Sequence, residues 1–184
     1  PPSQPPPMTS TATACAASAL FASAQAATVL DQSFSSGLGD FTVSGTTSTG
    51  SNGVVLRGGT SPGRLQSRVI STANYSNLKL TVTRSTSGLD SGESLTLTAV
   101  VNGQTRTLEA PRSASGSASF QLGNGVSSVS LQFALAANSL LETGTIGRVT
   151  LEGDAACSGS GCNPTPTAGA TIVFNVTRTY SATS

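Results

Sequence analysis

The chain carries few side chains that can do chemistry. Its 184 residues include eight carboxylates, nine basic side chains with Lys79 as the single lysine, three cysteines, and neither histidine nor tryptophan. Without histidine there is no imidazole base, which excludes a Ser-His-Asp triad and a histidine-bound zinc. The basic residues are scattered and the formal net charge is +1. Nucleic-acid binding is therefore not expected, because no basic patch exists to neutralise a run of phosphates.

The carboxylates are the groups that remain for acid–base chemistry or for holding a cation. They are Asp31, Asp40, Asp90, Glu93, Glu109, Glu142, Glu152 and Asp154. A glycosidase needs two carboxylates that face each other across a cleft. The chain has no tryptophan and only two tyrosines to stack sugar rings in such a cleft. We expect most of these acids to be solvated loop charges, and we expect the chain not to be an enzyme.

Two sets of carboxylates offer the oxygen ligands that Ca²⁺ takes. The densest lies in the turn-rich segment Ser87–Glu93, between two expected strands. The other lies on the first and last expected strands, between which a jelly-roll module can close a calcium site. The alternative to a structural calcium is an ordinary acidic turn without any cofactor. The five candidate ligands are Asp31, Asp90, Glu93, Glu152 and Asp154.

The cysteines favour a disulfide. Cys15 falls in an N-terminal segment that resembles a signal peptide, whereas Cys157 and Cys162 are separated by four Gly and Ser residues. Such a flexible loop lets the two sulfurs meet, and an exported chain encounters an oxidising compartment. The alternative is a pair of metal ligands, for which no histidine or further cysteine completes a site.

The middle of the chain must position these groups, and its pattern is that of β-strands. Apolar and polar residues alternate most clearly in Leu78–Thr83, Leu95–Thr98 and Val129–Phe133. Such alternation puts one face of a strand on a core and the other in water. Strands are expected over 29–34, 39–43, 53–57, 63–69, 78–84, 94–101, 104–109, 118–122, 128–134 and 147–151.

The turns and the spacing define the fold class. Asn102-Gly103 between two expected strands predicts a two-residue hairpin turn, because both central residues need positive φ. Strands that recur about every ten residues without a helix between them predict an all-β antiparallel β-sandwich. The expected strand number favours a jelly roll, whose core is expected to include Val69 and Val100 as well as the alternating apolar residues.

The composition divides the chain into four parts. Residues 1–27 are a Pro-rich start followed by a predicted signal peptide that ends at the A-x-A signature Ala24-Gln25-Ala26; the alternative is an Ala-rich helix that stays in the mature protein. Residues 28–154 are the sandwich domain, and 155–169 are a linker with the expected disulfide. Residues 170–184 are an isolated strand or the truncated start of a following β domain. No stretch is long and apolar enough for a membrane span. Because the N-terminal segment resembles a signal peptide, we expect a secreted protein.

Several stretches resemble jelly-roll accessory domains of secreted bacterial hydrolases. They are 31–45 (DQSFSSGLGDFTVSG), 71–78 (STANYSNL), 86–93 (TSGLDSGE) and 139–143 (SLLET). Thr171–Tyr180 (TIVFNVTRTY) is similar to the first strand of a starch-binding module. The resemblance implies a carbohydrate-binding-like accessory part of a secreted, multi-domain protein that acts on polysaccharide.

Two functions of different class follow. The first is a non-catalytic secreted β-sandwich module, associated with carbohydrate and appended to an extracellular polysaccharide-acting enzyme, with a polysaccharide as its partner. The second is a structural subunit of an extracellular filament or adhesive layer. In that case Ala170–Ser184 completes the sheet of a neighbouring copy, since edge strands accept added strands through main-chain hydrogen bonds.

Overall fold

The structure is a computed structural model that describes residues 25–155. Within this range it contains β-strands and one short 3-10 helix, in the order β1 (Gln25–Ser33), η1 (Phe34–Ser36), β2 (Phe41–Ser44), β3 (Thr47–Gly50), β4 (Gly53–Arg57), β5 (Arg64–Ser67), β6 (Ile70–Ser71), β7 (Tyr75–Ser87), β8 (Ser94–Val101), β9 (Gln104–Glu109), β10 (Ser117–Gly123), β11 (Ser128–Ala136) and β12 (Thr143–Ala155). The linker with Cys157 and Cys162, the expected strand within 170–184 and most of the expected signal segment lie outside the described residues.

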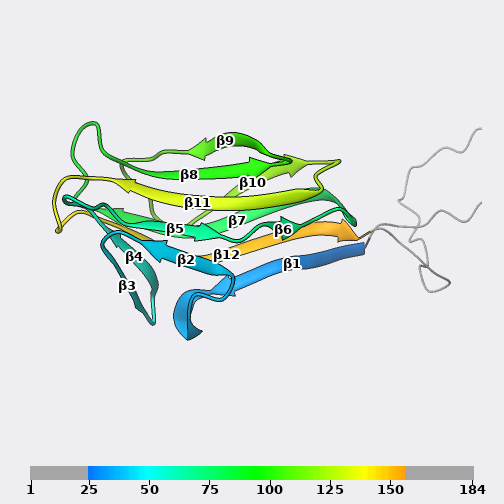
Figure 1. Cartoon of the computed structure of the whole chain (residues 1–184), viewed down its shortest axis with the longest axis horizontal. Coiled ribbons are helices and arrows are strands. Elements are labelled where there is room, and N and C mark those ends of the chain that lie inside the picture. Colours follow the sequence, from blue (N-terminus) through cyan, green and yellow to red (C-terminus); the bar gives the residue numbers. More distant parts are fainter. Residues whose placement is uncertain (1–24, 156–184) are drawn as a thin grey trace, which may run out of the picture. The chain divides into compact units, whose positions relative to one another are not determined.

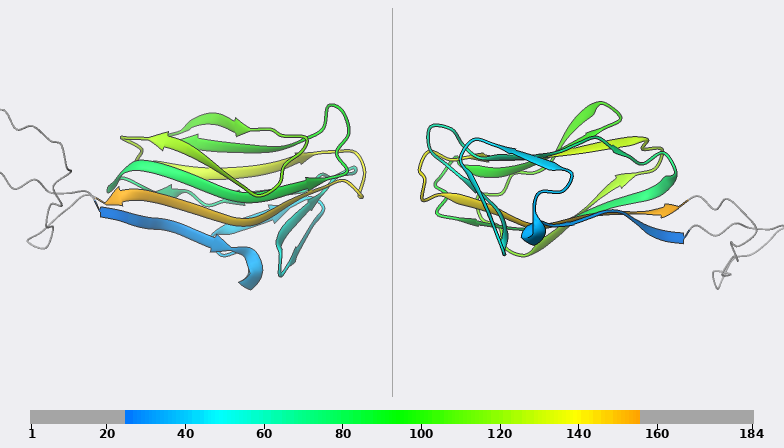
Figure 2. Two further views of the ribbon diagram at one scale, coloured as in Figure 1. Left: turned by 180° about the vertical axis from the view of Figure 1, so that it is seen from behind. Right: turned by 60° about the horizontal axis from the view of Figure 1, so that its bottom comes forward.

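The strands form two antiparallel sheets (Figure 1). The first has the order β10-β7-β12-β4-β3, and the second has the order β2-β5-β11-β8-β9 with β6 beside β11. In the first sheet β12 pairs with β7 on one side; on the other side it pairs first with β4 and then with β1. Figure 2 shows β1 and β12 running side by side along one margin of the sandwich.

The chain passes back and forth between the two sheets, as a jelly roll requires. β4 belongs to the first sheet, β5 to the second, β7 to the first, β8 and β9 to the second, β10 to the first, β11 to the second and β12 to the first. The expected all-β antiparallel sandwich is therefore confirmed. Among the described residues no helix has the length and apolar character needed to cross a membrane.

Alternation along the strands builds the core between the sheets. In β8, Leu95, Leu97, Ala99 and Val101 are buried and the residues between them are half-buried. β7, β11 and β12 show the same period of two, which is the period at which successive side chains point to opposite faces. The largest fully buried side chains are Phe34, Phe133, Leu56, Leu65, Leu78, Leu80, Leu95, Leu97, Leu131, Ile146, Leu151 and Val54.

The structure corrects the expected core at two positions. Val69 has 69% of its surface exposed, because β5 ends at Ser67 and the strand alternation does not continue to it. Val100 is half-buried, whereas its neighbour Val101 is buried, because β8 turns its odd-numbered residues inward. The expected hairpin is confirmed: Asn102 and Gly103 have φ of 50° and 78° between the paired residues at the ends of β8 and β9.

Candidate functional site

Two loops meet at one end of the sandwich. One runs from the end of β7 to the start of β8 (residues 88–93), and the other from the end of β11 to the start of β12 (residues 137–142). β7 pairs with β12 and β8 pairs with β11, so both loops cross between the sheets at the same end. The pairs Ser87↔Thr143 and Ser94↔Ala136 fix this juxtaposition.

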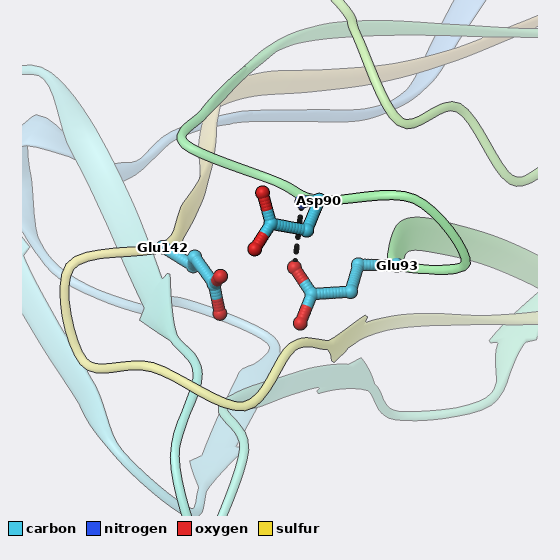
Figure 3. Close-up of side chains that lie close together, drawn as sticks. All are labelled: Asp90, Glu93 and Glu142. Atoms are coloured by element: carbon cyan, nitrogen blue, oxygen red, sulfur yellow. Dashed lines mark hydrogen bonds between the residues drawn. The ribbon is translucent and has the colours of Figure 1, made fainter.

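Three carboxylates converge where these loops meet (Figure 3). Asp90 and Glu93 come from the first loop and Glu142 from the second, and one oxygen from each lies within 4.8 Å of the others. Asp90 is exposed, Glu93 is half-buried and Glu142 is buried. We call these three residues the acidic cluster.

Backbone N–H groups shape the first loop around Glu93. The N–H of Asp90 donates to Glu93 Oε2 at 2.8 Å, and the N–H of Glu93 donates to the carbonyl of Asp90 at 3.2 Å. Gly88 and Gly92 both have positive φ, which lets the loop turn back twice within six residues. The sequence thus folds this segment so that its two carboxylates share one side of a tight turn.

The second loop is closed by hydrogen bonds from its own backbone N–H groups to the side chains of Glu142 and Ser139. Glu142 Oε2 accepts the N–H groups of Asn138 at 2.9 Å and Ser139 at 2.6 Å, while Ser139 Oγ accepts the N–H of Leu141 at 3.3 Å. Ser139-Leu140-Leu141-Glu142 is the S-x-x-E pattern of a capping box, used here on a single turn. The buried carboxylate of Glu142 therefore has a structural role of its own.

The two loops are also tied to each other through one donor. The N–H of Asn138 points to Glu93 Oε1 at 3.0 Å as well as to Glu142. The pKa of Glu93 is lowered, first by the hydrogen bond from the backbone of Asp90, with smaller contributions from the N–H of Asn138 and from Glu142; partial desolvation opposes the shift. None of the ion pairs within residues 25–155 includes a member of the cluster.

The arrangement fits a hard divalent cation. Carboxylate oxygens are the ligands of Ca²⁺, which takes six to eight oxygens at about 2.3–2.6 Å, so carbonyls and water would complete the shell. Three acidic groups this close repel one another unless hydrogen bonds or a cation compensate. Asp90, Glu93 and Glu142 are the residues that would hold the ion, and it would cross-link the two loops. Calcium binding stays a prediction.

The other three candidate ligands lie elsewhere on β1 and β12. Asp31 is held by Arg148 through a bidentate pair, with Nε to Oδ1 at 2.7 Å, and this hydrogen bonding lowers the pKa of Asp31. Asp154 Oδ2 accepts the side-chain N–H of Asn77 at 2.6 Å. Glu152 is exposed on β12. Among the described residues, the convergent acidic group contains none of these three.

Comparisons with known proteins find structural neighbours at low sequence identity. No family model matches the chain, and no curated protein matches its sequence. A family two carbohydrate esterase from Cellvibrio japonicus is similar at a TM-score of 0.47 and 12% identity, over 73% of this chain and 37% of the esterase chain. The enzymatically active domain of tailspike protein 4 from bacteriophage CBA120 is similar at a TM-score of 0.38 and 11% identity, over 66% of this chain and 20% of the other.

The first of these neighbours corrects one expectation. The sequence predicts that the chain is not an enzyme, but one of the proteins with a similar structure is a carbohydrate esterase, which is an enzyme. That expectation is wrong and is withdrawn. The physical reason is that a missing histidine excludes imidazole catalysis only, whereas carboxylates also serve as general acids and bases. This chain spans little more than a third of the esterase chain.

Proposed function

We propose that this chain is a carbohydrate-associated β-sandwich module of a secreted protein that acts on polysaccharide. The proposal is supported by the positions that the stretches similar to jelly-roll accessory domains occupy in the fold. Stretches 86–93 and 139–143 are more than forty residues apart in the sequence, yet they form the two loops of the acidic cluster. Stretch 31–45 spans the end of β1, η1 and β2, so the similarity follows the sandwich itself.

Secretion is part of the same proposal. It is supported by the Ala-rich segment ending in Ala24-Gln25-Ala26 and by a composition rich in Gly, Ser and Thr. β1 already begins at Gln25 and pairs with β12 from that residue onward. Cleavage after Ala26 or Ala27 would therefore shorten β1 at its first residues but leave the pairing from Thr28 to Ser33.

Binding to soluble polysaccharides tests the proposal. The full chain is run through native gels that contain one polysaccharide each, from a panel of neutral and acidic glucans, mannans, xylans and pectins, with bovine serum albumin as the non-binding reference. We expect retardation in at least one neutral polysaccharide. Migration equal to the reference across the whole panel would contradict the carbohydrate association.

The filament alternative rests on Ala170–Ser184, which lie outside the described residues. What favours it within the sandwich is the outermost strand β9 of the second sheet, where Gln104, Thr105, Arg106 and Thr107 are all exposed. An uncovered edge strand of this kind accepts an added strand. Light scattering on the full chain and on a chain lacking 170–184 separates the two functions, since oligomers lost on deletion favour the filament and a monomer in both disfavours it.

A further inference from the structure

A cavity of about 420 Å³ opens at the margin where β1 of the first sheet passes the second sheet. Its lining includes Val29 and Leu30 of β1 together with Asp40, Arg68 and Val69. Tyr75, the first residue of β7, also lines it. Figure 1 shows the strands β1, β2 and β6 on this side of the sandwich. The volume lies within the range of about 300–1,000 Å³ that small-molecule sites occupy.

The apolar side chains of the cavity keep part of their surface exposed. Val69 is 69% exposed, while Val29, Leu30 and Tyr75 are half-buried against the core. Ligand-binding sites are typically concave and lined mostly by apolar side chains. Tyr75 is also the one tyrosine within residues 25–155. Aliphatic side chains with one aromatic ring match the C–H face of a sugar ring.

The polar part of the cavity is a preorganised ion pair. Arg68 Nη2 lies 2.9 Å from Asp40 Oδ2, and the backbone N–H of Arg68 donates to the carbonyl of Asp40 at 2.9 Å. The backbone bond fixes the two residues side by side before any ligand arrives. Both side chains keep substantial exposure, at 70% for Arg68 and 37% for Asp40, so their remaining donors and acceptors face solvent.

The charge of this pair selects the class of ligand. A guanidinium only donates hydrogen bonds and a carboxylate only accepts them, so the pair suits neighbouring hydroxyl groups that each do both. The pair has no net charge, and the carboxylate of Asp40 opposes an anionic ligand beside Arg68. A neutral sugar satisfies the apolar side chains and the ion pair together.

We propose that this cavity binds one neutral sugar residue of a polysaccharide, with Tyr75 against the ring and the Asp40–Arg68 pair on its hydroxyls. The inference rests on the proposed carbohydrate association and assigns it a place in the fold. The cavity is separate from the acidic cluster, because Tyr75 starts β7 and the loop that carries Asp90 and Glu93 follows its end.

Tyrosine fluorescence gives a direct readout of the cavity. The chain has no tryptophan and two tyrosines, so Tyr180→Phe in the full chain leaves Tyr75 as the single emitter. This protein is titrated with neutral cello-, malto-, xylo- and manno-oligosaccharides and with an anionic oligogalacturonate. We expect a saturable change in emission with at least one neutral oligosaccharide. Tighter binding of oligogalacturonate than of every neutral oligomer would overturn the inference.

Variants then locate the binding. Arg68→Ala and Val69→Asp change exposed side chains and leave the core intact, and each is expected to weaken binding about tenfold or more. Tyr75→Ala is expected to weaken gel retardation by at least as much. The matched control is Arg106→Ala, an exposed arginine on β9 that is expected to leave binding unchanged. Thermal unfolding confirms that each variant is folded.

The outcomes separate the two proposals. If the parent chain is retarded by a polysaccharide and Arg68→Ala and Val69→Asp are retarded equally, the sugar binds elsewhere; the cavity assignment fails while the carbohydrate association stands. If the parent chain is retarded by nothing and Tyr75 emission is constant in every titration, both proposals fail. Loss of binding in the cavity variants with Arg106→Ala unchanged supports both.

Discussion

Replacing Glu142 by alanine tests whether its buried carboxylate braces the loop between β11 and β12. The side chain is 5% exposed, and Oε2 accepts the N–H groups of Asn138 at 2.9 Å and Ser139 at 2.6 Å. Hydrogen bonds to a charged group contribute about 1.5–3 kcal/mol each, so two at the lower bound give about 3 kcal/mol. Removing one negative charge from beside Asp90 and Glu93 returns about 1 kcal/mol. The expected net loss is about 2 kcal/mol of the free energy of unfolding.

The assay is urea unfolding followed by circular dichroism, with thermal unfolding in parallel. A loss of about 2 kcal/mol lowers the midpoint temperature by roughly 6–10 °C for a domain of this size, with the urea m-value unchanged. Glu142→Gln keeps one acceptor oxygen and is expected to lose about half as much. The control is Glu152→Ala, an exposed carboxylate on β12, the strand that follows Glu142, and its stability is expected within about 0.5 kcal/mol of the parent. A Glu142→Ala protein as stable as the parent would contradict this reasoning, because it would mean that relief of repulsion within the acidic cluster fully offsets the lost hydrogen bonds.

Three further predictions concern charge. Calcium chloride at one hundred times the dissociation constant, compared with EDTA at equal ionic strength, is expected to raise the free energy of unfolding of the parent by about 2.7 kcal/mol and to leave that of Glu142→Gln unchanged; an equal rise in both would place any bound ion elsewhere. Glu109 is only 17% exposed and is bound by Arg84 through two hydrogen bonds of 2.8 Å, so Arg84→Ala leaves this carboxylate without its partner. Urea unfolding is expected to show a loss of about 2–4 kcal/mol in the free energy of unfolding, and a loss under about 0.5 kcal/mol would contradict this. The pKa values of Glu93 and Asp31 are lowered in the fold. Their contribution to the free energy of unfolding is therefore present above the ordinary values of 4.5 and 3.8 and is lost as the pH falls through the lower folded values. Urea midpoints measured from pH 7 to pH 3 should accordingly fall less in Glu93→Gln than in the parent.

The strands that could be predicted from the sequence are those whose boundaries are local. β4, β8 and β9 begin and end where expected, because a glycine, a polar turn or the Asn102-Gly103 hairpin limits each of them. β12 is longer than expected, and Gly147 and Gly153 lie at its irregularities in register with β7. At Gly144 a side chain would come within 2.9 Å of Leu95, so packing across the sandwich sets that residue. Alternation alone cannot report such contacts.

The acidic cluster was predicted in part. Asp90 and Glu93 are near neighbours in one loop, so their proximity follows from the sequence. Glu142 lies 49 positions after Glu93, and its approach depends on the pairing of β7 with β12 and of β8 with β11. The signal that could have found it is the S-x-x-E pattern Ser139–Glu142 directly before the last strand. Pairing across such separations is set by the whole fold rather than by local pattern.

The two sites of this domain are far enough apart to be tested independently. β7 has 13 residues, with Tyr75 at its start and Ser87 at its end, and a strand of that length spans about 40 Å. Effects of substitutions more than about 10 Å apart with no shared partners add. A Glu142→Ala, Arg68→Ala double variant should therefore combine the stability loss of the first with the sugar-binding loss of the second. Non-additivity in either measurement would mean that the long strands transmit a change from one end of the sandwich to the other.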